Sequence, residues 1–131
     1  MTMTTSAQNT LSERQFLLCA CASLEAQGDM QRLDSAIRLA LDGGVTVNEL
    51  KEAFSHLYAY TGFPRSLNAL GVLSKVLDDR KTQGITDNEG KPFVRPELWD
   101  NAEEALKQGT AVQAKLVGGQ PFRYDFCPQD D

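Results

Sequence analysis

The stretch Gly44–Leu70 reads GVTVNELKEAFSHLYAYTGFPRSLNAL and contains two helix starts separated by one break. Thr46 and Glu49 have the spacing of a capping box, which predicts a helix that runs to about Tyr60. Gly62 breaks this helix, and Pro64 suits the first turn of the next one. We therefore expect a bend here, followed by a long helix that ends near residue 84.

Two more helices are expected upstream of this stretch, each bounded by capping residues. Thr10, three residues before Glu13, is the candidate cap of the first helix, and Gly28 ends it. Asp29 can cap the second helix, which ends at the Gly43-Gly44 pair because glycine readily takes positive φ. In the second helix, apolar residues fall on one face at helical spacing: Met30, Leu33, Ile37 and Leu41.

Downstream, Pro96 is expected to open a fifth helix, from Glu97 to about Lys107, after an irregular segment. No stretch has the alternation of a strand, so the fold class is expected to be all-α, a bundle of about five to six helices with an extended C-terminal tail. The predicted organisation is a flexible N-terminus over residues 1–9 and a helical core over 10–84. Residues 85–131 would form a loop, the fifth helix and a tail that packs on the core or on a neighbouring subunit.

The charge balance disfavours nucleic acid and anionic membranes as partners. The 131 residues include 13 basic and 18 acidic side chains, for a formal net charge of −5, and the basic ones are scattered. Arg80-Lys81 is interpreted as the solvated end of a helix. The polar N-terminus does not resemble a signal peptide, and no apolar run approaches the ~20 residues of a membrane span, so a cytoplasmic location is expected.

The three cysteines do not predict a disulfide framework or a metal site. Cys19 and Cys21 are two residues apart on a helix and point about 200° apart, so both are expected to pack as small apolar residues. Cys127 has no histidine or other base nearby. One histidine with scattered carboxylates lacks the ligand spacing of zinc, and no metal or cofactor is predicted.

Polar residues on the third predicted helix form the candidate functional site. His56, the only histidine, has Glu52 one turn before it and Tyr60 one turn after it, beside the apolar stripe. An imidazole and a phenol at a groove edge suit acid–base chemistry, and Arg65 beyond the bend could hold a carboxylate. The candidate catalytic residues are His56, Tyr60 and Arg65, and the candidate substrate-binding residues are Glu49, Glu52 and Asn68. The alternative is that all of these residues have structural or interface roles.

The same stretch resembles the signature of the carboxymuconolactone decarboxylase family, which also contains the alkylhydroperoxidase D-like proteins. The matching features are Gly44-Val45-Thr46, Glu49, Glu52, Tyr60, Gly62-Phe63-Pro64 and Asn68-Ala69-Leu70. The resemblance covers about residues 11–83. It implies an alkylhydroperoxidase D-like helical bundle, a trimer or hexamer of identical subunits, and lyase chemistry on a small carboxylate-bearing metabolite.

The departures from the family pattern concern its redox centre. Where the peroxidase-type members carry Cys-x-x-Cys, this chain has Asp29-Met30-Gln31-Arg32, and Ala36 stands in place of the following histidine. Gln15 stands where a glutamate often occurs. The chain is therefore more similar to the redox-inactive first half of some tandem members, and alkylhydroperoxidase activity is not expected. Two functions remain open: an acid–base lyase acting on a small organic acid, or a non-catalytic oligomeric scaffold or small-molecule binding module.

Overall fold

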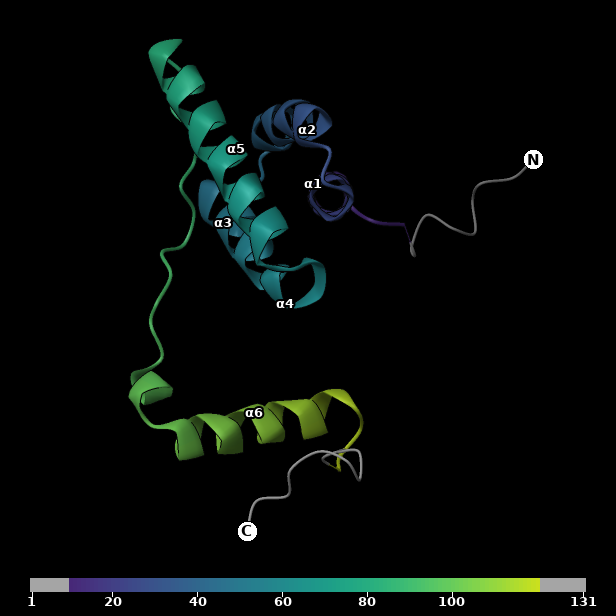
Figure 1. The fold of residues 1–131 in the computed structure, drawn as a ribbon, viewed down its shortest axis with the longest axis vertical. Helices are drawn as coiled ribbons and strands as arrows, with labels where there is room; N and C mark the ends of the chain where they lie inside the picture. The colour runs from purple at the N-terminus through teal and green to yellow at the C-terminus, as the bar shows by residue number, and fades with distance from the viewer. Residues whose placement is uncertain (1–9, 121–131) are drawn as a thin grey trace, which may run out of the picture. The chain divides into compact units, whose positions relative to one another are not determined.

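The computed structural model describes residues 10–120. The chain divides into two compact units, and the boundary lies between Phe93 and Val94. The described part of the first unit contains α1 (Glu13–Gln27), α2 (Met30–Asp42), α3 (Val47–His56), α4 (Tyr58–Thr61) and α5 (Phe63–Thr82). The second contains a 3₁₀ turn, η1 (Glu97–Asp100), and α6 (Ala102–Leu116). No strand occurs among the described residues, which confirms the prediction of an all-α fold (Figure 1).

The long helix α5 organises the first unit, because the other four helices of the unit all pack against it. It lies along α3, and the short α4 sits at the end of this pair (Figure 1). α1 and α2 pack against each other. The core takes side chains from α1, α2, α3 and α5, chiefly Cys21, Leu33, Ile37, Leu50, Phe54, Ala69, Leu73 and Val76.

The predicted caps of α2 and α3 are confirmed, whereas the predicted start of α1 is wrong. Asp29 accepts from the backbone N–H of Arg32, and Thr46 and Glu49 form the capping box of α3. α1 begins two residues later than expected, because Ser12 and Gln15 make a complete capping box there. The glutamine that departs from the family pattern thus has a local structural role.

The face that α1 buries is narrow. Cys21 and Glu25 are its buried residues, while Phe16 is 63% exposed and Cys19 is exposed. Apolar residues occur all around this helix, so their periodicity does not single out one face.

The expected third helix is divided at Leu57 into α3 and α4, and Gly62 then makes the bend. Gly62 has φ 90° and ψ 158°, a conformation essentially restricted to glycine. Pro64 lies in the first turn of α5 as predicted. Phe63, at the bend itself, is 58% exposed and packs edge-on against Tyr58, with the ring centroids 5.9 Å apart.

Residues 85–93, called the strap below, are attached to α3 and α5. The carbonyl groups of Asn88 and Glu89 accept from the backbone N–H groups of Val47 and Asn48, which open α3. These N–H groups have no partner within the helix itself, so the strap satisfies them. The first unit consequently extends past residue 84 to Phe93.

Arg80 is not the solvated helix end that the sequence predicts. It is only 5% exposed, and its guanidinium donates to Asp87 of the strap and to Asp42 at the end of α2. Because the partners lie 7 and 38 residues away, the basic pair Arg80-Lys81 gave no local sign of this role.

In the second unit, the predicted fifth helix is replaced by two elements. Residues Glu97–Asp100 form the 3₁₀ turn η1, and Asn101 then caps α6 by accepting from the N–H of Glu104. α6 continues through Gly109 to Leu116, beyond the predicted end near Lys107. The predictions for residues 1–9 and for the C-terminal tail from residue 121 concern segments outside the described residues.

Candidate functional site

His56 and Tyr60 are brought together at the junction of α3 and α4. His56 is the last residue of α3 and Tyr60 lies within α4; their ring centroids are 5.3 Å apart at an angle of 53°. His56 is exposed, and Tyr60 is 74% exposed. An imidazole and a phenol in contact can pass protons to a bound molecule, but this pair faces solvent in a single chain.

The two glutamates of the candidate site have different surroundings. Glu49 accepts from the backbone N–H of Thr46 as the second half of the α3 capping box and forms an ion pair with Arg14 of α1. Its carboxylate therefore links α1 to the start of α3, two turns away from His56. Glu52 is exposed on the surface of α3.

Arg65 is turned toward the C-terminal end of α1. Its Nη1 donates to the carbonyl oxygen of Ala26, and its Nε would lie 3.5 Å from a Cβ placed on Gly28. A cation at the C-terminal end of a helix is favourable because the last carbonyl groups carry partial negative charge. The structure thus gives Arg65 a contact with α1, separate from the His56–Tyr60 pair.

Asn68 lies exposed on α5, whereas the nearby Ser66 is buried and bonds to α3. The buried Ser66 hydroxyl donates to the carbonyl oxygen of Phe54 over 2.7 Å and so ties α5 to α3. Of the six candidate residues, only His56 and Tyr60 are in contact with each other in the described interactions.

Glu25 is a buried acidic residue that the sequence reading missed. It is 0% exposed; its Oε1 accepts from the hydroxyl of Thr61 over 2.7 Å, and its Oε2 has no partner among the described residues. A buried carboxylate with one hydrogen bond is costly, and such groups often mark functional or strained positions. Its position one turn after Cys21 was the available signal, because i and i+4 share a helix face.

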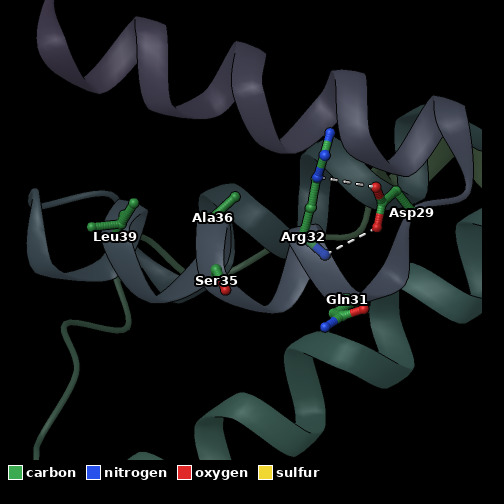
Figure 2. A pocket seen from close by; sticks show the side chains of 6 residues that line it. All are labelled: Asp29, Gln31, Arg32, Ser35, Ala36 and Leu39. Carbon is green, nitrogen blue, oxygen red and sulfur yellow. Dashed lines mark hydrogen bonds and ion pairs between the residues drawn. The ribbon is translucent and has the colours of Figure 1, made fainter.

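The second feature that the sequence reading did not anticipate is an open depression along α2. Its volume is about 640 Å³, and Figure 2 shows its six lining residues: Asp29, Gln31, Arg32, Ser35, Ala36 and Leu39. Within it, the guanidinium of Arg32 lies 3.6 Å from the carboxylate of Asp29. This is the segment at which the peroxidase-type pattern has its dithiol and histidine, and here it carries a carboxylate, an amide, a guanidinium and a hydroxyl.

The two described cysteines do not form a thiol pair. Cys21 is buried in the core and Cys19 is exposed, so the expectation that both pack inside holds for Cys21 alone. Burial raises the pKa of Cys21 to about 11, which leaves its thiol protonated and unreactive at neutral pH.

A comparison with known protein families shows which family the chain belongs to. A family model described as carboxymuconolactone decarboxylase family matches residues 1–75, which is more than half of the 131 residues. The chain belongs to this family. Searches of curated proteins and of solved structures give no match.

For this member of the carboxymuconolactone decarboxylase family, the matched region includes α1 to α4 and most of α5. It therefore contains the His56–Tyr60 pair, Arg65, Glu25 and the α2 depression. The strap and α6 lie outside it. Within residues 10–120, no helix is long and apolar enough to cross a bilayer.

Proposed function

We propose that this protein is a self-associating helical module of the carboxymuconolactone decarboxylase family, assembled as a trimer or hexamer through the α4–α5 corner. The observation that carries the proposal is a group of large side chains at that corner: Tyr58, Tyr60, Phe63 and Leu67 are 55%, 74%, 58% and 54% exposed. Neighbouring exposed apolar side chains of this size are typical of association surfaces.

The corner is suited to association because its backbone is fixed by the core beneath it. Ser66 and Ala69 are buried in the same turns of α5 that present Phe63 and Leu67 outward. Phe63 and Leu67 are four residues apart, so they lie on one face of the helix. Burying such a side chain fully is worth roughly 1.5–3 kcal/mol, so a few of them from each copy make a stable contact.

Light scattering after size-exclusion chromatography tests the assembly. We expect the wild-type protein to have the mass of a trimer or hexamer at micromolar concentration. The double variant Phe63→Ser/Leu67→Ser should dissociate, because it removes apolar contact area without touching the core. Val94→Ser is the matched control, since Val94 is 78% exposed and lies in the second unit. A monomeric wild-type protein would contradict the proposal.

The second candidate function is acid–base lyase chemistry on a small organic acid. The contact between His56 and Tyr60 favours it, because a neighbouring copy packed on the corner would shield this pair from water and strengthen its interactions. Arg65, bonded to α1, would have to exchange its contact with Ala26 to hold a substrate carboxylate. The non-catalytic module needs no such rearrangement, and for this reason we rank it first.

A panel of small organic acids, including unsaturated lactone acids, separates the two candidates. If the lyase function is correct, one acid is decarboxylated, and His56→Ala abolishes the turnover while the oligomer mass stays the same. Gln27→Ala, an exposed change near Arg65, serves as the control. If no acid is consumed and none shifts the melting temperature, the protein acts as a module without chemistry.

A further inference from the structure

α6 carries an apolar stripe that has no partner in the described chain. Ala102, Leu106, Gly109, Val112 and Leu116 recur at intervals of three and four residues, which places them on one side of the helix. Leu106, Val112 and Leu116 are 45%, 57% and 80% exposed, and no residue of α6 is buried. An isolated helix of this length is marginal in water, so a stripe of this kind calls for a partner.

The stripe is symmetric about its central residue. Leu106 and Val112 lie three residues on either side of Gly109, and Ala102 and Leu116 lie seven residues on either side. If two copies of α6 pair in opposite directions with their Gly109 residues facing, Leu106 meets Val112 of the second copy. Ala102 then meets Leu116, so each end pairs a small side chain with a large one.

Gly109 itself supports a close approach at the centre. Glycine is among the poorest helix formers, and α6 keeps one in its middle without using positive φ. A Cβ at this position would meet nothing within 4 Å, so packing within the chain does not require the glycine. A second helix that crosses here would explain it, because a residue without a side chain lets two helix backbones come near each other.

The charges at the ends of α6 and its helix dipole favour the antiparallel direction. Glu103 and Glu104 lie in its first turn and Lys115 in its last. Antiparallel pairing places the acidic end of each helix beside the basic end of the other and opposes the two helix dipoles. Parallel pairing would align the two helix dipoles and put the acidic first turns of both copies at the same end of the pair.

We infer that α6 pairs with α6 of a second copy, antiparallel, across a two-fold axis at Gly109. A surface that contacts itself in this way is the usual basis of a two-fold dimer. The inference rests on the proposed self-association in one respect: a pair of four-turn helices is weak alone and gains from cores that already hold the copies together. It uses a different surface from the α4–α5 corner. Two trimers of cores, linked by three α6 pairs, would make a hexamer.

Disulfide trapping in the full-length chain tests the geometry. In a Cys19→Ser/Cys127→Ser background, we would mix chains carrying Leu106→Cys with chains carrying Val112→Cys and oxidise them mildly. The expected product is the mixed 106–112 disulfide. Leu106→Cys chains alone should not crosslink, because antiparallel pairing offsets the two positions by roughly 9 Å along the axis, beyond the reach of a disulfide.

Two outcomes would overturn the inference. One is crosslinking of Leu106→Cys chains with themselves at least as fast as with Val112→Cys chains, which indicates parallel pairing. The other is no crosslinking of the mixture above the level given by Ala111→Cys chains, whose substituted position lies on the opposite side of α6.

Light scattering separates this inference from the proposed function. Leu106→Glu/Val112→Glu should halve the mass of the assembly, whereas Ala111→Glu, the control on the opposite side, should leave it unchanged. If the wild-type protein is a dimer that these two substitutions convert to a monomer, the α6 pairing stands and the association of cores fails. If the mass falls only in Phe63→Ser/Leu67→Ser, the core association stands and the α6 pairing fails.

Discussion

Glu25 places a carboxylate in the apolar interior between α1 and α4 with one hydrogen bond, from Thr61. Replacing a buried polar group by an apolar one of similar size is often neutral or stabilising. We expect Glu25→Met to keep the free energy of unfolding within about 1 kcal/mol of wild type or to raise it. Thr61 retains a partner, because its hydroxyl lies 3.0 Å from the carbonyl oxygen of Leu57 and can donate to that oxygen instead.

Glu25→Ala is the comparison, because it removes the same carboxylate but leaves a cavity, which should cost about 2–4 kcal/mol. Urea unfolding followed by circular dichroism measures both variants. If Glu25→Met is as destabilised as Glu25→Ala, the carboxylate itself contributes to stability and the interpretation is wrong.

Gly62 is the residue on which the bend between α4 and α5 depends. Its φ of 90° with ψ of 158° is strained for any residue with a side chain, so Gly62→Ala should lower the free energy of unfolding by roughly 1–3 kcal/mol. Gly71 is the matched control. It lies in the exposed middle of α5 with open space around a Cβ, so Gly71→Ala should raise stability by about 0.5–1 kcal/mol. Thermal unfolding that shifts in the same direction for both variants would contradict this reasoning.

Residues whose roles are set by near neighbours were predicted well from the sequence. The capping box of Thr46 and Glu49, the cap at Asp29 and the stop at Gly28 each depend on at most a few positions along the chain. The partners of Arg65 and Glu25 lie 39 and 36 residues away, so no local pattern reveals them.

The strap is an element whose attachment depends on a buried ion pair. Asp87 accepts from both Nε and Nη2 of Arg80, and its side chain is 11% exposed. These contacts raise the pKa of Arg80, which therefore stays charged. Asp87→Asn should lower the free energy of unfolding by about 1.5–3 kcal/mol, the range of a hydrogen bond to a charged group, because Asp42 still pairs with Arg80.

Hydrogen exchange locates the effect of this substitution. The N–H groups of Val47 and Asn48, which donate to the strap, should exchange faster in Asp87→Asn, while those in the middle of α2 are unchanged. Glu89→Gln is the control, since Glu89 contributes its carbonyl group to the strap and its side chain is exposed. Equal protection of Val47 in wild type and Asp87→Asn would rule out the ion pair as the anchor.

Among the elements, α2 followed its pattern most closely, and α6 departed from its pattern most. α2 has a single apolar face, so its buried residues Leu33, Ile37 and Leu41 could be picked from spacing alone. α6 was expected to end before Gly109, because glycine usually ends helices, yet the helix passes through it. The same glycine that misled the prediction of its end is central to the pairing inferred for α6.

The whole molecule consists of a core with its strap and a separate C-terminal unit, and a comparison of two truncated chains tests this division. The fragment 1–93 keeps Asp87 and the carbonyl groups of Asn88 and Glu89, whereas the fragment 1–84 loses them. Without Asp87, Arg80 keeps Asp42 alone as its partner. Hydrogen bonds to a charged group contribute about 1.5–3 kcal/mol each, so the loss should be at least about 2 kcal/mol.

We therefore expect the fragment 1–93 to unfold in one cooperative urea transition and the fragment 1–84 to unfold at lower urea concentration with a smaller slope. The slope is the change in the free energy of unfolding with urea concentration, and it falls because less surface is buried when the strap is absent. Both fragments lack α6, so the comparison is independent of any pairing through that helix. Equal midpoints would mean that the strap merely lies on the core, and a fragment 1–93 without a cooperative transition would mean that the core depends on the second unit.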